Sequence, residues 1–496
     1  MNDMKNRYIS SFKHISLLLL FLWVGVSCSE NKIVEQEFLE LSLTSYTFNA
    51  KNAEDLVIKV NASPQWNTSL DHAAWFTVIE RGEDYMVIHA EENTSIAPRA
   101  SVLEVKSGIY TKYISISQLG KRDPFDQYVT FPQFQQTALS PDGKYLAGVL
   151  IQALSNTEQV YNLFRIDLTT GDQIQIENTR NYINLHMIAN TGLIVGDKAG
   201  VGGYYTPEGE WNNLELTPEG RKAFVTGVSA DGQQIVGSIL VKNKYQPAVW
   251  KNGDVTFLPL PEKDLFDKPL AEGVMAGGCS VDGSVIYGFT SSTKVLMYWK
   301  EGEVYYAGSD IFKLGEVEKP GPGGIGQGII VPHMDCLHTR LYGYGISPNG
   351  RYLAAFLSEA DENKKESLYP AIYDIQEQKT FVVRDLANLD NTIEGEAIGV
   401  TNDRDIFYNQ FEVLNEFPPI KFPVYGYAYY NKEQKSVSVS EYLKKETGMS
   451  FLSKNFMMQY YSAEGKTYYG MISRPSLKGR TMTYWVTSNI SYLSIG

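Results

Sequence analysis

Several features that would direct a functional assignment are missing from this sequence. After residue 26 no apolar run approaches 18 residues, so the rest of the chain is expected to be soluble. Basic residues are outnumbered, with 44 Lys and Arg against 57 Asp and Glu, and the net charge of −13 argues against nucleic acid as a partner. The chain also has no Gly-x-Ser-x-Gly, His-Glu-x-x-His or Walker A motif, which leaves the corresponding hydrolase, zinc-protease and nucleotide-binding classes unsupported.

Cysteine is scarce as well, with three residues in the whole chain. Cys28 is explained by its position near the N-terminus, described below. Cys279 and Cys336 could pair or stay reduced. Because Cys279 lies in an apolar strand pattern, a buried free thiol is the favoured interpretation for it.

Aromatic residues and glycine are plentiful, with 33 Tyr, 22 Phe, 7 Trp and 42 Gly. This composition favours strands and turns over helices. A length of 496 residues is enough for more than one domain. The bulk properties therefore indicate an all-β protein of ordinary globular character.

The first 28 residues have the pattern of an export signal. Lys5, Arg7 and Lys13 precede the apolar run at 15–26, which is too short for a comfortable membrane span. The run ends in Gly-Val-Ser-Cys28, which resembles the lipobox of bacterial lipoproteins, although Gly stands where Leu is usual. The resemblance implies a signal peptide over 1–27 and lipidation of Cys28; ordinary signal cleavage with an incidental cysteine is the alternative.

Residues 28–36 form a polar, acidic segment that is expected to act as a tether. Similar tethers accompany lipoproteins of Bacteroidota. The resemblance implies an outer-membrane lipoprotein, on the cell surface or on the periplasmic face, that is held to the membrane by its lipid.

Residues 37–121 contain several short runs of alternating polar and apolar residues, which predict a β-sandwich. Trp66, Trp75, Arg99 and the terminal Gln118-Leu-Gly occur in an order that resembles the BACON domain. This family is an immunoglobulin-like sandwich whose name implies carbohydrate binding. Trp66 and Trp75 are accordingly candidate sugar-stacking residues, but they lie in apolar strand patterns, and core packing is the favoured interpretation.

From residue 125 onward, a strand, a turn of the form Ser-x-Asp-Gly and a second strand recur. Serine and aspartate side chains stabilise tight turns and glycine supplies a positive φ, so the repeated aspartates are interpreted as structural. In four copies a second glycine follows five residues on, where crowded strands are expected to leave no room for a side chain. The seven copies, two of them degenerate, begin at Ser140, Ala189, Ser229, Ser280, Ser347, Thr401 and Ser462.

Each copy is followed by an aromatic strand and a polar turn, which gives four strands per period. The pattern resembles propeller repeats of the WD40-like and TolB-like types and the HAF repeats. It predicts a C-terminal β-propeller of about seven four-stranded blades over residues 125–496. A parallel β-solenoid is the alternative, but its rungs are shorter.

One inter-repeat segment contains an unusual group of residues. A Gly/Pro-rich stretch at 319–328 leads to His333, Asp335, Cys336 and His338. Imidazoles and a carboxylate at this spacing could bind a metal or a ligand, so His333, Asp335 and His338 are the candidate site. An insertion with incidental histidines is the favoured alternative, because the spacing matches no strong metal motif. No cofactor is expected.

Three functions are compatible with these features. The first is a non-catalytic glycan-binding component of a polysaccharide-utilisation system. It is supported by the resemblance to the BACON domain, by the expected location in the cell envelope and by the abundance of aromatic residues. The second is a carbohydrate-active enzyme, a glycoside hydrolase or polysaccharide lyase, that uses the propeller pocket. The third is a scaffold for a protein partner in the envelope. The absence of catalytic motifs favours a protein that is not an enzyme.

Overall fold

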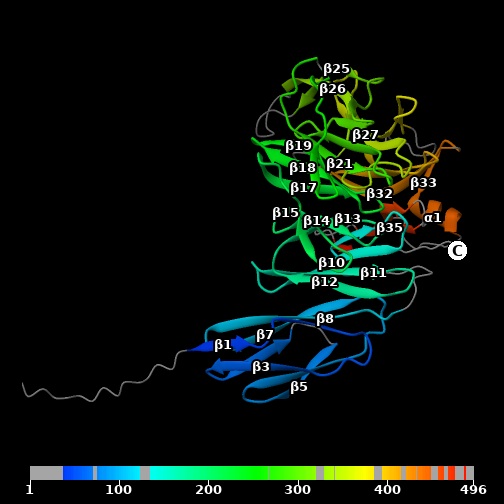
Figure 1. Ribbon diagram of the computed structural model, residues 1–496. Helices are drawn as coiled ribbons and strands as arrows, with labels where there is room; N and C mark the ends of the chain where they lie inside the picture. Colours follow the sequence, from blue (N-terminus) through cyan, green and yellow to red (C-terminus); the bar gives the residue numbers. More distant parts are fainter. Residues whose placement is uncertain are drawn as a thin grey trace, which may run out of the picture.

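The computed structural model describes residues 37–487, apart from 71–74, 123–133, 266, 320–328, 340, 385–393, 415–419, 432, 448–455, 463–466 and 475–484. Cys28 therefore lies outside the described residues. The described part is nearly all β, with one helix, α1 (Val439–Thr447). No helix in this part is long and apolar enough to span a membrane. The fold is an immunoglobulin-like sandwich next to a β-propeller (Figure 1).

The sandwich consists of two four-stranded sheets, in the orders β1-β3-β6-β5 and β2-β8-β7-β4. Strand β3 alternates buried and exposed residues, as a strand with one face on a core must. The inner faces pack Phe48, Ile58, Phe76 and Ile116 into one core. The strands are β1 (Phe38–Leu41), β2 (Ser45–Phe48), β3 (Leu56–Ser63), β4 (Trp66–Leu70), β5 (Phe76–Arg81), β6 (Tyr85–Ala90), β7 (Arg99–Ser107) and β8 (Tyr110–Gln118).

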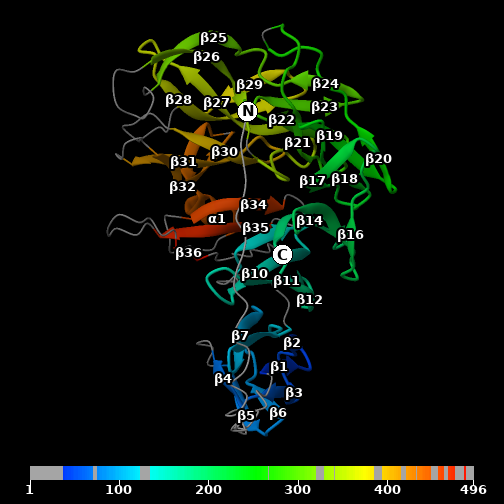
Figure 2. The ribbon, with the colours of Figure 1, turned by 90° about the vertical axis from the view of Figure 1, so that its left-hand side faces the viewer.

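The propeller sheets follow one another along the chain and surround a common centre (Figure 2). Within the described residues there are seven such sheets, and β34 of the last contacts β9 of the first. The first three comprise β9 (Gln136–Leu139), β10 (Tyr145–Ala153), β11 (Gln159–Asp167) and β12 (Gln173–Thr179); β13 (Ile183–Ile188), β14 (Ile194–Lys198), β15 (Val201–Tyr205) and β16 (Trp211–Asn213); and β17 (Gly220–Val228), β18 (Gln234–Val241), β19 (Lys244–Lys251) and β20 (Asp254–Phe257).

The remaining sheets depart twice from four strands. The fifth has five strands and the last has three within the described residues. They comprise β21 (Val274–Cys279), β22 (Val285–Thr290), β23 (Leu296–Lys300) and β24 (Glu303–Tyr306); β25 (Lys313–Lys319), β26 (Ile329–His338), β27 (Tyr352–Ala360), β28 (Glu366–Asp374) and β29 (Lys379–Val382); β30 (Gly395–Val400), β31 (Ile406–Leu414), β32 (Ile420–Tyr430) and β33 (Lys435–Ser438); and β34 (Phe456–Ser462), β35 (Thr467–Arg474) and β36 (Trp485–Thr487).

The repeated turns have the structural chemistry that their sequence predicts. The Ser229 hydroxyl donates to Asp231 Oδ1 over 2.6 Å and accepts from the N–H of Gln234 over 3.0 Å, while Asp231 Oδ1 also accepts from the N–H of Gln233 over 3.0 Å. In the five described turns that contain the glycine, this residue adopts a positive φ, 74° at Gly232. Neighbouring turns are also linked, because the N–H of Ala230 donates to the carbonyl of Val281 over 2.8 Å. The repeat therefore joins adjacent sheets as well as shaping each turn.

These turns predict acid sensitivity. The hydrogen bond from the Ser229 hydroxyl lowers the pKa of Asp231. Burial by itself raises the pKa of Asp282, but hydrogen bonds from Ser280 and Ser284 outweigh the effect of burial, so the pKa of Asp282 is lowered as well. A carboxylate with a lowered folded pKa stabilises the fold above its unfolded pKa of about 4, and this contribution is lost as the pH falls through the folded pKa. We expect the free energy of unfolding, measured with urea, to fall below about pH 4. In the D231N/D282N variant this fall should be smaller.

The fifth repeat is a natural control for this variant, because Asn349 forms the same bonds without a charge. The Ser347 hydroxyl donates to its Oδ1 over 2.7 Å. Asparagine is therefore compatible with the turn, and D231N/D282N should fold. Unfolding free energies that decline in parallel with pH for the two proteins would show that these aspartates do not cause the acid sensitivity.

The second glycine of the repeat has no room for a side chain, as expected. A Cβ on Gly237 would lie 2.0 Å from the carbonyl oxygen of Phe224, and one on Gly288 would lie 2.2 Å from that of Met275. On Gly148, a Cβ would meet the ring of Phe134 at 2.5 Å. At Gly237 and Gly288 the crowding comes from the innermost strand, which bulges toward the glycine.

A polar layer joins the sandwich to the first propeller sheet. Asn162 is fully buried, accepts from Gln175 Nε2 over 2.9 Å and from Asn178 Nδ2 over 2.5 Å, and donates to Gln152 Oε1 over 3.1 Å. On the sandwich side, the Ser117 hydroxyl donates to Gln175 Oε1 over 2.9 Å. Because buried amides are costly to leave unpaired, this network fixes the two parts relative to each other.

The N162L variant should destabilise the protein by about 3 kcal/mol, because it leaves several buried donors and acceptors without partners. Urea unfolding measures the loss, and limited proteolysis between the two parts reports any loosening. Asn61 bonds a surface glutamate in the sandwich and serves as the control. If N162L and N61L lower stability equally, the polar layer does not hold the parts together.

Candidate binding site at the centre of the propeller

The innermost strands carry a recurrent irregularity. In several sheets the register between the innermost strand and its neighbour shifts by one residue, which leaves one residue of the innermost strand unpaired. Such bulges redirect side chains and are common next to functional sites. The unpaired residues with described surroundings include His186, Thr226, Gly277 and Ile398.

A segment of the fifth sheet, Leu341–Gly345, lies across the centre; we call it the axial segment. Its Gly343 N–H donates to the carbonyl of Gly277 over 2.7 Å. Its Tyr344 hydroxyl donates to the carbonyl of Leu139 in the first sheet. A Cβ on Gly343 would lie 2.9 Å from Met187 of the second sheet. The axial segment therefore contacts three other sheets, the first, second and fourth.

Tyr342, in the axial segment, has a side chain that is partly exposed to solvent. Its side chain is 39% exposed, and its ring lies edge-on to His186 at 6.1 Å and to Phe289 at 5.6 Å between centroids. Burial and the nearby phenol of Tyr245 raise the pKa of Tyr342. The phenol therefore stays neutral around pH 7 and offers both a hydroxyl and an aromatic surface.

His186, whose ring contacts that of Tyr342, belongs to a polar group at the bulge of β13. His186 Nε2 lies 3.1 Å from Asp197 Oδ2 and 3.0 Å from Asn184 Nδ2, and the His186 and Asp197 side chains are 11% and 6% exposed. Asp197 Oδ1 is buried and has no hydrogen-bond partner among the described residues. Because an unpaired buried oxygen costs about 1–3 kcal/mol, it indicates an acceptor that a ligand's hydroxyl or amine can satisfy.

An aromatic ring beside a carboxylate and an amide is suited to a sugar. Aromatic side chains present a large apolar surface that suits the C–H faces of pyranose rings, and Asp and Asn oxygens accept from sugar hydroxyls. The His186–Asp197 pair also has the geometry for proton transfer, because the imidazole Nε2 lies 3.1 Å from the carboxylate Oδ2. We call Asn184, His186, Asp197 and Tyr342 the central site.

The predicted metal or ligand residues do not form one site. His333 and Asp335 lie on one face of β26, with His333 Nε2 3.4 Å from Asp335 Oδ1, whereas His338 lies on the other face, 3.2 Å from Cys336 Sγ. Successive side chains of a strand point to opposite faces, and the part of this inter-repeat segment at 329–338 is strand β26. Among the described residues, no group of three His, Cys, Asp or Glu side chains could hold a metal ion.

The predicted sugar-stacking tryptophans belong to the sandwich core. Trp66 and Trp75 are 5% and 9% exposed, and Arg81 and Arg99 lie over their rings at 5.0 and 4.7 Å. Both rings therefore belong to the core cluster and present little surface to a sugar, as the core-packing interpretation expects.

Cys279 and Cys336 are free and buried. Burial raises the pKa of each thiol to about 12, so neither thiol is a nucleophile near neutral pH. Of the two alternatives left open by the sequence, the structure has the reduced one.

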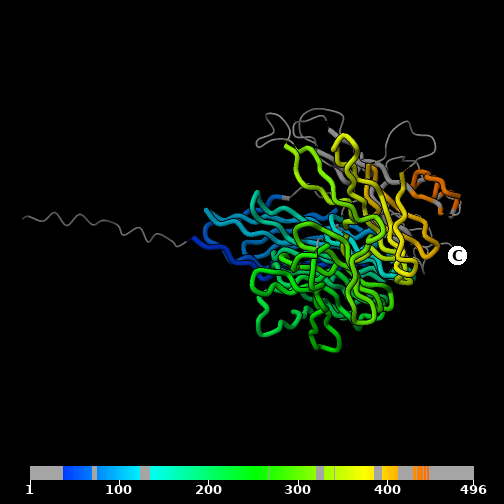
Figure 3. The backbone as a smooth tube through the Cα atoms, turned by 90° about the horizontal axis from the view of Figure 1, so that it is seen from above, coloured from blue at the N-terminus to red at the C-terminus, as the bar shows by residue number. Residues whose placement is uncertain are grey.

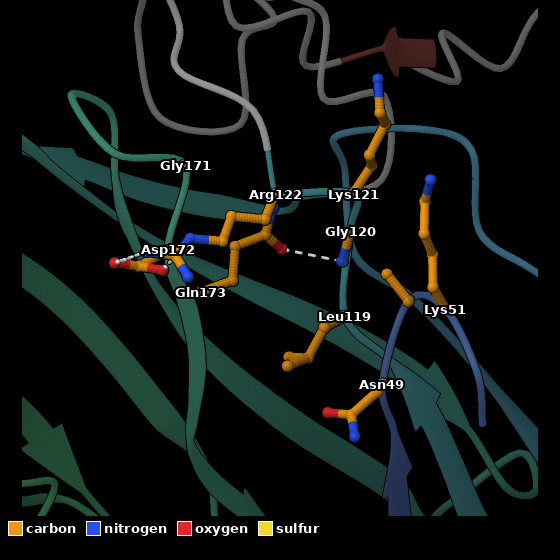
Figure 4. A pocket seen from close by; sticks show the side chains of 10 residues that line it. Asn49, Lys51, Leu119, Gly120, Lys121, Arg122, Gly171, Asp172 and Gln173 are labelled. Atoms are coloured by element: carbon orange, nitrogen blue, oxygen red, sulfur yellow. Dashed lines mark hydrogen bonds and ion pairs between the residues drawn. The ribbon is translucent and has the colours of Figure 1, made fainter. Parts of the chain in front are cut away.

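A hollow lies between the sandwich and the first propeller sheet. It has a volume of about 470 Å³, and its lining includes Lys51, Lys121, Arg122, Asp172 and Gln173 (Figure 4). Arg122 pairs with Asp172 at 2.6 Å, and Lys51 pairs with Glu92 at 3.2 Å. Because two of its charges already have partners, this hollow is a weaker candidate than the central site.

No family model matches the chain, and no curated protein matches it. Solved structures give distant matches. A putative TolB from Agrobacterium tumefaciens is 16% identical, with 51% of this chain and 82% of that chain covered and a TM-score of 0.31. An oligogalacturonate lyase in complex with manganese is 9% identical, with coverages of 71% and 92% and a TM-score of 0.40. The β-propeller domain of the Pyrococcus furiosus trilobed protease is 12% identical, with coverages of 82% and 96% and a TM-score of 0.35.

Proposed function

We propose that this protein is a cell-envelope lipoprotein, anchored through Cys28, that binds carbohydrate at the central site as a non-catalytic component of a polysaccharide-utilisation system. The observation that carries the proposal is the partly exposed ring of Tyr342 beside His186, whose partner Asp197 has a buried Oδ1 without a hydrogen-bond partner among the described residues. A sugar can cover the ring with its C–H face and donate a hydroxyl to the carboxylate. The resemblance of residues 37–121 to the BACON domain supports the same class of ligand.

The test begins with a panel of plant and host oligosaccharides and isothermal titration calorimetry. For the best-binding member, the Y342A variant should lose about tenfold in affinity, since aromatic contacts contribute about 0.5–1.5 kcal/mol beyond the area that they bury. Tyr305 is the matched control, because it is 42% exposed but stacks on Tyr298, at 5.1 Å, in the fourth sheet. Equal affinities for Y342A and Y305A would remove the central site from the proposal.

A carbohydrate-active enzyme is the second candidate, and the His186–Asp197 pair favours it. If the purified protein releases reducing ends or unsaturated products from a bound glycan, and H186A abolishes the release, the enzyme replaces the binding protein. If binding occurs without product and H186A affects only affinity, the non-catalytic function stands.

A further inference from the structure

The hairpin between β7 and β8 ends in an unusual turn. Ser107 pairs with Tyr110, so Gly108 and Ile109 form a two-residue turn, with Gly108 at a φ of 53°. The tips of such turns normally carry Gly, Asn, Asp or Ser. Here Ile109 is 82% exposed and Tyr110 is 43% exposed. An apolar side chain that gains no burial at a turn tip indicates a surface with a partner.

The turn lies at the place where the described chain begins. Glu37 Oε2 accepts from the N–H of Ile109 over 3.0 Å, and the next residue, Phe38, is 38% exposed. We call Phe38, Ile109 and Tyr110 the apolar tip. The end of the sandwich at which β1 begins projects past the propeller in two perpendicular views (Figures 1 and 3). The propeller therefore does not cover this end.

The length of chain before this point limits its distance from the lipid. Glu37 is nine positions after Cys28, with eight residues between them. Fully extended, they span at most about 30 Å. The apolar tip is thus the part of the described structure that lies next to the proposed anchor.

We propose that the apolar tip contacts the bilayer in which the Cys28 lipid is inserted, an inference that rests on the lipoprotein part of the proposed function. Tyrosine is favoured at membrane interfaces because its ring is apolar and its hydroxyl is polar, and Ile and Phe bury apolar area at the boundary with the acyl chains. The anchor alone leaves the orientation of the sandwich open. A second contact at the tip fixes it and points the propeller away from its point of attachment.

The lipidated full-length I109C variant, labelled with a polarity-sensitive fluorophore, tests this contact in phosphatidylethanolamine–phosphatidylglycerol vesicles. Cys279 and Cys336 are buried with pKa values of about 12, so the label reacts at position 109. We expect the emission to shift to shorter wavelength and to be quenched by headgroup nitroxide lipids. The same label in K242C, on a propeller turn where the lysine side chain is 84% exposed, should show neither effect.

Two further variants of the labelled chain distinguish a specific contact of the apolar tip from nonspecific adsorption of the protein to the vesicles. Y110S should reduce the quenching several-fold, whereas I79S, which removes an isoleucine that is 55% exposed elsewhere on the sandwich, should not. If the protein floats with the vesicles but positions 109 and 242 behave alike, the tip contact is overturned and the anchor stands. If the protein does not float at all, the lipid anchor fails, and the tip inference fails with it. Emission that shifts only when another envelope protein is added would assign the tip to a protein partner and also overturn the bilayer contact.

Discussion

Replacing Gly237 with alanine is expected to lower the free energy of unfolding by about 3 kcal/mol. The added methyl group would lie 2.0 Å from the carbonyl oxygen of Phe224 and 3.1 Å from the Cα of Val225. Both are backbone atoms of the bulged innermost strand, so no side-chain rotation can relieve the clash. Urea unfolding followed by tryptophan fluorescence measures the loss, and the midpoint should fall clearly.

Gly315 in β25 is the matched control. It also lies in a strand, but the nearest atom to its Cβ would be that of Ala360 at 3.9 Å, an ordinary contact. G315A should therefore be neutral or slightly stabilising, since alanine restricts the unfolded chain. If G237A and G315A are equally stable, the innermost strand can shift, and the glycine is not required by the bulge.

Replacing Asp197 with asparagine is expected to weaken oligosaccharide binding by roughly 10- to 100-fold with little change in stability. Hydrogen bonds to charged groups contribute about 1.5–3 kcal/mol, and 1.4 kcal/mol corresponds to a tenfold change in affinity. Stability should change by less than about 1 kcal/mol, because Oδ1 has no partner in the described structure to lose and the asparagine carbonyl can keep the contact of Oδ2 with His186. Calorimetric titration and urea unfolding of the same preparation measure the two quantities.

Asp374 is the contrasting case. Its carboxylate is buried and paired with Arg351 at 2.7 Å, so D374N should lose stability and leave binding unchanged. A D197N protein that is destabilised but binds normally would assign Asp197 to the fold rather than to the central site.

The propeller could be predicted from the sequence because its repeat is local. The Ser-x-Asp-Gly turn forms its hydrogen bonds within five residues, as Ser229, Asp231 and Gln234 show, so the pattern is readable without knowing the fold. The second glycine was predictable for the same reason, since it occurs at a fixed spacing from the turn. The bulge that requires it could not be predicted, because a register shift depends on the partner strand.

The central site could not be predicted because its residues meet across distant parts of the chain. His186 and Tyr342 are separated by more than one hundred and fifty positions in the sequence, and no spacing connects them. The alternation Tyr342-Gly-Tyr-Gly345 is the one local signal, since glycines beside aromatics indicate close approach of the backbone. The close spacing of His333 and His338 in the sequence suggested a site there instead. Side chains alternate between the two faces of a strand, however, and these two histidines lie on opposite faces of β26.

The hydroxyl of Tyr344, which reaches Leu139, affects how the molecule carries mechanical load. If the chain is anchored at Cys28 as proposed, a pull on the anchor would reach the first propeller sheet through the polar layer around Asn162. From there, part of the force would pass through Tyr344 directly to the fifth sheet. The contact between β34 and β9, where the ring closes, would carry correspondingly less of it.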